Sequence, residues 1–413
     1  MDMAKGIPAE LHHETLNKTI EKMPAPDSLV FTELFGSEQY ESDRIRWILE
    51  YGTAGMTPFV APGAPAPTFG DEALYSEGSA VAAYWKEKTF LEEQLLNNLR
   101  EPLSNSQRRT ARRQIARQQR RLKNRCTRRR EWMMAKAFFD HKISYNRPGG
   151  TKVTVDYGVP AQNKQTLTGD DVWDDGTGSP GNTATPIRDI YDIKKQFSED
   201  VGVNPTDFFI NSEVLKILMF NTDIQDLLKK SAFGEGDLFA RPAPVIGQLL
   251  GLGNLTVYDD LFEVSTWITA DVSSGATTVN VEDATDFEGG EKARIYPMDN
   301  VFTYEEVTID SVDVTNDTVT LSSGLNNSYK AGQARFVMRK KFITDDKVGM
   351  FARQVDGEDV AEFMEAPFGN DRHFGMYADS NDEWDPEGLW MRIQNKGLPV
   401  IYHPDALFTL TIS

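Results

Sequence analysis

The 413-residue chain contains a single cysteine, Cys126. One cysteine excludes an intrachain disulfide framework and a zinc module built on several thiolates. No apolar run reaches about 18 residues, so no transmembrane helix is expected. Residues 1–10 also lack the apolar stretch of a signal peptide. At about 150 residues per domain, we expect a soluble protein of two or three domains, made in a reducing compartment.

Basic residues are fewer than acidic residues in this chain. The chain has 63 acidic residues against 44 Lys and Arg, for a net charge of −19. This balance argues against a protein that coats nucleic acid or an anionic membrane with its whole surface. The charge is unevenly spread, because residues 107–130 contain no acid and leave the rest of the chain at −31. Their twelve basic residues are Arg108, Arg109, Arg112, Arg113, Arg117, Arg120, Arg121, Lys123, Arg125, Arg128, Arg129 and Arg130.

The basic segment has the composition and periodicity of a helix. Arg, Gln, Lys and Ala are good helix formers. Apolar residues recur at steps of seven and four, which describes one stripe of an α-helix; they are Ile115, Leu122, Cys126, Met133 and Ala137. Pro148-Gly149-Gly150 stops the pattern. We therefore predict a long helix over about residues 104–143.

Two interpretations of the basic residues stay open. The helix faces a polyanion, either phosphate or an acidic protein, or it is a long solvated helix balanced by carboxylates of its own or neighbouring chains. Base-specific recognition is not expected, since no zinc-finger spacing or interleaved aromatic pattern accompanies the arginines. Cys126 lies on the apolar stripe and is predicted to be a packing residue and not a nucleophile.

The N-terminal part predicts an arm followed by a hairpin. Residues 1–43 lack sustained periodicity, which is typical of an extended arm that needs a partner surface to become ordered. From Arg44 the strand-like run RIRWILEYG is followed by a Gly- and Pro-rich stretch, and a second run, VAAYWKEKTF, covers residues 81–90. Two such runs predict a long two-stranded loop. It either packs on another subunit or forms a lid over an active site.

The remaining chain predicts an α/β block and a separate β-domain. Residues 184–260 alternate amphipathic helices with buried strands. Residues 265–338 show only closely spaced strands and turns, which favours a small sandwich or barrel inserted into the chain and projecting outward. The C-terminal run ALFTLTIS predicts a strand tied into a sheet.

Catalytic chemistry has no signature in the sequence. The nucleophile elbow G-x-S-x-G, the zinc motif H-E-x-x-H and the P-loop are all missing. The acidic loop at Asp170, Asp171, Asp174 and Asp175 does not follow the EF-hand pattern and is predicted to be solvated. We therefore expect no catalytic residue, no cofactor and no metal, and a protein that is not an enzyme.

Two stretches carry a resemblance to a known family. They are RIRWILEYG with AAYWKEKTFL, and the C-terminal EWDPEGLWMRIQNKGLPVIYHPDALFTLTIS. In this order around an arginine-rich helix they resemble the lambda-like major capsid protein E family of tailed phages. The resemblance implies an α+β fold of the Hong Kong ninety-seven type. The implied segments are an N-terminal arm (1–43), an E-loop (44–92), the spine helix with part of the peripheral domain (93–183), an axial domain part (184–264), an inserted β-domain (265–338), the axial domain return (339–355) and peripheral closing strands (356–413).

The resemblance also implies a function. The chain would be the major head protein of a tailed double-stranded DNA bacteriophage and would self-assemble into hexamers and pentamers of an icosahedral shell around the genome. It would be made in the host cytoplasm and end in the virion. Expected partners are other copies, scaffold, portal and decoration proteins, and packaged double-stranded DNA by local contact, but no membrane. An encapsulin-type shell with cargo, or an acidic hydrolase with a hairpin lid, are the alternatives. The twelve basic residues are then the candidate inter-subunit or genome-facing surface.

Overall fold

The computed structural model describes residues 11–24, 26, 29–51, 59–65, 74–100, 105–146, 152–173, 184–231, 235–300 and 302–412. The chain divides into two compact units. The first contains residues 1–141, 157–258 and 345–413. The second contains residues 142–156 and 259–344. Each unit is described separately below.

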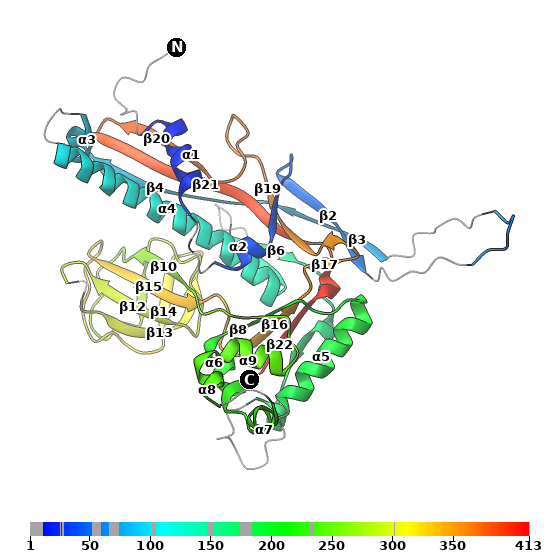
Figure 1. Ribbon diagram of the computed structural model, residues 1–413. Coiled ribbons are helices and arrows are strands. Elements are labelled where there is room, and N and C mark those ends of the chain that lie inside the picture. The colour runs from blue at the N-terminus through cyan, green and yellow to red at the C-terminus, as the bar shows by residue number, and fades with distance from the viewer. Residues whose placement is uncertain are drawn as a thin grey trace. The chain divides into compact units, whose positions relative to one another are not determined.

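A long helix lies on a sheet in the first unit (Figure 1). Helix α4 (Asn105–Phe139) confirms the predicted basic helix. All five residues of its apolar stripe are buried, and Ile115, Leu122 and Cys126 pack in one core with Leu389 and Met391 of the sheet. The sheet strands are β1 (Gly36–Gln39), β19 (Ala361–Glu365), β21 (Gly388–Ile401), β20 (Tyr377–Glu383) and β4 (Ala83–Glu92), with β21 pairing with β19, β20 and β4. Helix α3 (Glu93–Arg100) joins β4 to the segment before α4 and buries Leu96 and Leu99 in the same core.

The N-terminal arm packs on its own chain. Helix α1 (His13–Lys22) buries Leu16 and Ile20, which lie one turn apart on one face of the helix. These residues join the core between α4 and the sheet. Helix α2 (Phe31–Leu34) follows, and β1 then pairs in parallel with β19. The prediction of an extended arm that needs a partner for order is therefore wrong for the described residues, because a short amphipathic pattern was enough to dock it.

The predicted hairpin exists with a different second strand. Strand β2 (Arg44–Tyr51) pairs in antiparallel register with β3 (Leu74–Val81). The predicted partner run, residues 81–90, lies mostly in β4, which pairs with β21 instead. Strand β3 was not predicted because its sequence, LYSEGSAV, has no alternating apolar pattern. Much of the Gly- and Pro-rich tip lies outside the described residues.

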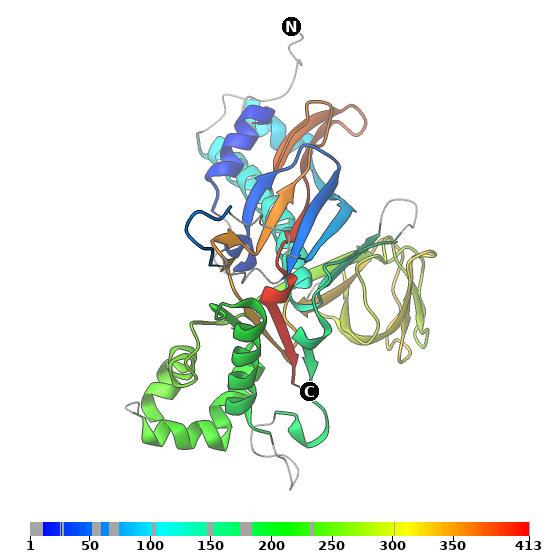
Figure 2. The same cartoon turned by 90° about the vertical axis from the view of Figure 1, so that its right-hand side faces the viewer.

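A second sheet of the first unit carries a group of helices (Figure 2). The strand order is β7 (Lys164–Thr166), β22 (Leu407–Thr411), β16 (Lys347–Phe351), β8 (Asp207–Ile210) and β9 (Asn254–Val257). Helix α5 (Pro186–Val201) buries Ile190, Ile193 and Phe197, as its amphipathic pattern predicts. The other helices are α6 (Ser212–Phe220), α7 (Thr222–Lys230), α8 (Glu235–Ala240) and α9 (Pro242–Leu249). The predicted α/β block and the C-terminal strand are confirmed.

The second unit is a barrel with its own core. Its strand order is β10 (Leu261–Trp267), β15 (Ala334–Lys341), β12 (Lys292–Pro297), β13 (Glu305–Asp313), β14 (Thr318–Leu321) and β11 (Thr278–Asn280). An antiparallel bridge between Ile268 and Val281 joins the two ends of this order. Val264, which directly precedes the predicted inserted domain, and Met338, its predicted last residue, face each other across β10 and β15. The unit also contains the hairpin of β5 (Lys142–Asn146) and β6 (Lys152–Asp156).

Candidate functional site

The basic residues of α4 divide by exposure. Four of them are partly buried: Lys123, Arg128, Arg129 and Arg130. The other eight are exposed: Arg108, Arg109, Arg112, Arg113, Arg117, Arg120, Arg121 and Arg125. The helix therefore brings the predicted residues together, but it uses them in two different ways.

The residues towards the end of the basic run hold the chain's own parts together. Lys123 Nζ donates a hydrogen bond to the Ile20 carbonyl at 2.7 Å and another to the Met23 carbonyl, at the end of α1. Lysine is a suitable partner there because the last carbonyls of a helix carry partial negative charge. Burial lowers the pKa of Lys123. Lys123 therefore fixes the end of α1 on α4 and is not part of the exposed basic surface.

Two arginines of the same region pair with acids of the sheet. Arg125 Nε donates to Glu87 Oε2 of β4 at 2.7 Å. Arg130 lies 3.5 Å from Glu365 of β19, and its guanidinium lies 4.3 Å from the centre of the Phe363 ring. Both contacts fix the helix on the sheet. Neither charge nor exposure alone distinguishes these two residues from the other arginines, because Arg125 is exposed and Arg130 is partly buried.

The first half of α4 presents an unbalanced positive face. Within the described residues, no carboxylate forms an ion pair with Arg109, Arg113, Arg117, Arg120 or Arg121, which we call the arginine face. At 1.5 Å per residue, the face runs for about 18 Å along the helix. Exposed arginines on one rigid helix can bind carboxylates or phosphates in a bidentate manner.

Glu131 is a buried acid that connects distant parts of the chain, and no motif in the sequence marks it. It is the first acid after the acid-free run, and it is fully buried. Its carboxylate accepts hydrogen bonds from the Phe31 amide at 2.8 Å and the Thr32 amide at 2.7 Å. The hydroxyls of Thr32, at 2.6 Å, and Tyr258, at 2.8 Å, also donate to it. Burial raises the pKa of Glu131, and these hydrogen bonds offset that effect only in part.

The Glu131 contacts seat Phe31 in an aromatic cluster. The Phe31 ring centre lies 5.0 Å from that of Phe209 and 5.6 Å from those of Phe138 and Tyr258. Phe139 adds an edge-on contact at 5.9 Å. Aromatic pairs at these distances stabilise beyond the area that they bury. The arm, α4 and the second sheet of the first unit therefore share one core.

Cys126 is a packing residue, as predicted. It is buried, and the indole Nε1 of Trp85 donates to its Sγ at 3.0 Å. Burial raises the pKa of the Cys126 thiol to about 12. A thiol with such a pKa is almost entirely protonated at neutral pH and is a poor nucleophile.

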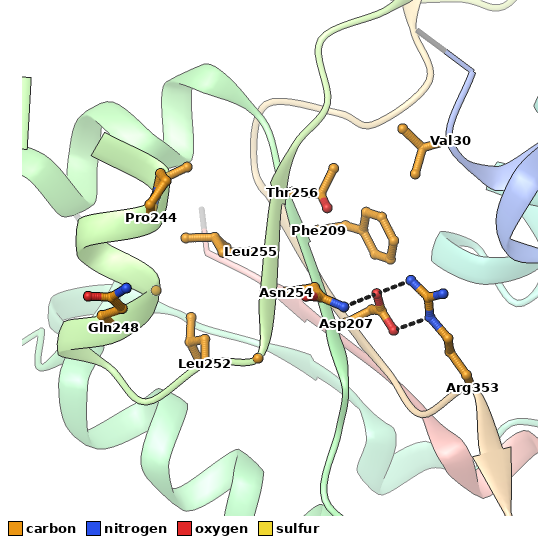
Figure 3. A pocket seen from close by; sticks show the side chains of 13 residues that line it. Val30, Asp207, Phe209, Pro244, Gln248, Leu252, Asn254, Leu255, Thr256 and Arg353 are labelled. Atoms are coloured by element: carbon orange, nitrogen blue, oxygen red, sulfur yellow. Dashed lines mark hydrogen bonds and ion pairs between the residues drawn. The ribbon is translucent and has the colours of Figure 1, made fainter. Parts of the chain in front are cut away.

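A pocket of 450 Å³ lies between α9 and strands β8 and β9 (Figure 3). Its one acidic lining residue, Asp207, accepts two hydrogen bonds from Arg353, each at 2.7 Å. Burial would raise the pKa of Asp207, but the hydrogen bonds from Arg353, Thr206 and Asn254 outweigh it and the pKa lies below the ordinary value. A carboxylate held ionised in this way is unsuited to donate a proton, so the pocket offers no acid–base pair.

The hairpin exposes apolar side chains. On β2, Ile45, Trp47 and Leu49 are buried, whereas Ile48 on the opposite face is 54% exposed. Near the tip, Phe59 is 104% exposed and Val60 is 52% exposed. One face of the hairpin thus packs on its own chain while the other leaves apolar surface uncovered.

The described residues offer no metal centre. No group of three or more His, Cys, Asp or Glu in them could hold a metal ion. None of their helices is both long enough and apolar enough to span a membrane.

Comparison with known proteins identifies the family and the fold. The family described as phage major capsid protein E matches residues 13–304. Among solved structures, a protein assigned as the capsid protein of an Escherichia coli CFT073 prophage is 13% identical, with a TM-score of 0.54 over 98% of this chain and 99% of that one. A phage-related protein of Bordetella bronchiseptica is 10% identical, with a TM-score of 0.49 over 98% of each chain. The capsid structure of cyanophage P-SCSP1u is 9% identical, with a TM-score of 0.43 over 100% of this chain and 92% of that one. No curated protein matches.

Proposed function

The chain belongs to the phage major capsid protein E family and is a structural protein of a phage capsid, and we propose that it forms the hexamers and pentamers of an icosahedral shell around a double-stranded DNA genome. Such a shell needs contacts that repeat between identical copies and close by rotation. The hairpin is the observation that carries the proposal. Its uncovered face requires a partner, and a neighbouring copy of the same chain supplies one in a shell.

The exposed apolar residues of the hairpin support this role as an E-loop. Ile48, Phe59 and Val60 face away from their own chain. Covering apolar surface stabilises an assembly by roughly 25 cal/mol per Å². In the proposed shell the hairpin lies over a neighbouring subunit and buries these side chains there.

Electron microscopy of the purified chain and of virions that contain it tests the shell. We expect closed particles from the wild-type chain and few or none from Phe59→Asp, which places a charge in the proposed contact. Thr315→Asp, at an exposed turn of the barrel, is the matched control and should assemble normally. Wild-type protein that stays monomeric under all assembly conditions, and is missing from virions, would contradict the proposal.

The basic helix is proposed to contact a polyanion within the particle. The partner is either the acidic surface of a neighbouring subunit or the packaged DNA. Replacing Arg112, Arg113, Arg120 and Arg121 with Gln should impair assembly or particle stability. Normal particles with a normal DNA content would count against this role.

The barrel is proposed to be an inserted accessory domain. Because Val264 and Met338 face each other across β10 and β15, a two-residue turn can replace residues 265–337. The barrel has its own buried core, so its removal should leave the first unit folded. Particles that still form would favour a surface accessory role, and a loss of assembly would favour a structural one.

An encapsulin-type shell is the alternative closest to this proposal. The match to the phage major capsid protein E family favours a genome over an enzyme cargo. Genomic DNA inside purified particles would separate the two. Scaffold, portal and decoration proteins are proposed as further partners, and proteins that copurify with assembling particles test for them. A hydrolase with a hairpin lid gains no support from the pocket, and a hydrolase activity screen tests it directly.

A further inference from the structure

A turn of the first sheet carries an exposed tryptophan among acids. Residues 384–387 connect β20 to β21, and Trp384 is 92% exposed. Asp382, Asp385 and Glu387 are exposed beside it. Within the described residues, no cation forms an ion pair with any of these three carboxylates. We call residues 382–387 the acidic turn.

The acidic turn is held in place by contacts of Trp390 with side chains of the adjacent strands. Trp390 Nε1 of β21 donates a hydrogen bond to Glu383 Oε2 of β20 at 3.1 Å, so Glu383 has a partner on the adjacent strand. The centre of the Trp390 ring lies 4.9 Å from that of Phe90, with the two rings tilted, and Lys88 Nζ lies 3.9 Å from the centre of the Trp390 ring. These contacts lie within the sheet, between β4, β20 and β21. They leave Trp384 and the three outer carboxylates without a partner in the described part of the chain.

The acidic turn and the arginine face are complementary in charge. The turn offers three carboxylates and a large ring, and the face offers five guanidinium groups on one helix. Resting on the proposed shell function, we propose that the acidic turn of one copy docks on the arginine face of α4 in a neighbouring copy. In this contact Trp384 stacks on a guanidinium while Asp382, Asp385 and Glu387 accept hydrogen bonds from arginines.

The ring favours a protein partner for the arginine face over DNA. Arginine covers aromatic rings well, because its planar cation is attracted by the ring face and is weakly hydrated. The same chain already uses this contact: Arg129 lies 5.2 Å from the Trp132 ring centre and Arg130 lies 4.3 Å from that of Phe363. DNA would satisfy the arginines but leave Trp384 uncovered and its acidic neighbours unpaired.

Both surfaces lie on every copy, which suits a closed assembly. Each copy can donate its turn to one neighbour and accept a turn on its own helix from another. Contacts of this heterologous kind form rings when the rotation closes. The proposal therefore needs no second type of protein.

An engineered cysteine pair tests the contact in assembled particles. Asp385→Cys and Arg113→Cys in one chain should form disulfides between copies, seen as a ladder of linked subunits on a non-reducing gel. The native Cys126 is buried and should not interfere. The pair of Asp385→Cys with Thr315→Cys, on the barrel, is the control and should give no ladder. Intact particles in which Asp385→Cys and Arg113→Cys stay unlinked would overturn the proposed contact.

A charge exchange provides a second readout. Changing Asp382, Asp385 and Glu387 to Lys should suppress assembly, and adding Arg113→Glu, Arg117→Glu and Arg120→Glu should restore it. Trp384→Ala should raise the protein concentration needed for assembly about fivefold. If the arginine changes alter only the DNA content, and the lysine changes leave assembly intact, the arginine face binds DNA and the contact is overturned. Wild-type chains that form no particles would overturn the proposed function as well, whereas normal wild-type particles confine a failure to this contact.

Discussion

The carboxylate of Glu131 accepts a hydrogen bond from the main-chain amide of Phe31, 100 residues earlier in the chain, at 2.8 Å. Phe31 is the first residue of α2, where the amides have no partner within the helix. A carboxylate at this end also meets the positive end of the helix dipole. The long helix therefore holds α2 of the arm through one buried acid, as it holds the end of α1 through Lys123.

Removing this acid should release the arm. Glu131→Ala leaves the amides of Phe31 and Thr32 and the hydroxyl of Tyr258 without their acceptor, and buried donors without a partner are costly. We expect the free energy of unfolding to fall by about 2–3 kcal/mol. Hydrogen exchange at residues 29–35 should accelerate. Glu33→Gln, an exposed change in the same helix, is the control, and unchanged exchange in Glu131→Ala would contradict the anchor.

The hairpin depends on a glycine beneath a tryptophan. Trp47 and Gly78 face each other across β2 and β3, and a Cβ on Gly78 would lie 2.3 Å from Trp47 Cε2. Because Trp47 is buried, its ring has little room to move. Gly78→Ala should lower the free energy of unfolding by about 1–3 kcal/mol. Thermal unfolding measures this loss, and Ser76→Ala, an exposed change on the same strand, should be close to neutral.

The ion pair of Asp207 and Arg353 should make stability depend on pH. The pKa of Asp207 in the folded protein lies below its ordinary value of 3.8, so the pair stabilises the fold above that pH and loses its effect as the pH falls through the folded pKa. At pH 7, Asp207→Asn should cost about 1.5–3 kcal/mol. Urea unfolding should show this difference at pH 7 and 5 and a smaller one at pH 3. A difference that does not shrink in acid would rule out the ionised carboxylate as its source.

Cys126 should resist labelling while the protein is folded. Its thiol is buried and its pKa is raised to about 12, and both effects suppress the reactive thiolate. A maleimide reagent should modify the native chain very slowly and the urea-unfolded chain rapidly. Asp385→Cys provides an exposed thiol for comparison. Rapid labelling of Cys126 in the native protein would show that the helix leaves the sheet in solution.

Helices and strands that are long or have a clear apolar period could be predicted from the spacing of apolar residues along the chain. The α4 stripe from Ile115 to Ala137 predicts its own burial, because five apolar residues at helical spacing need a surface to cover them. The strand β3 was missed because its polar residues gain their place only from pairing with β2. The same limit applied to the arm, where two apolar residues in α1 were too few to predict docking.

The family, the basic helix and the lack of recognisable catalytic motifs could all be predicted from the sequence. These properties depend on composition, on order along the chain and on spacing within one element. Which basic residues are internal partners depends on tertiary packing, since Arg130 and Arg113 are the same residue type on the same helix and differ in that Arg130 lies opposite an acid of the sheet. Tertiary packing also decided that Glu131 anchors the arm, because Phe31 and Tyr258 reach that carboxylate from distant parts of the chain. Contacts of this kind follow from how helices and strands pack together, which the spacing of residues along one element does not encode.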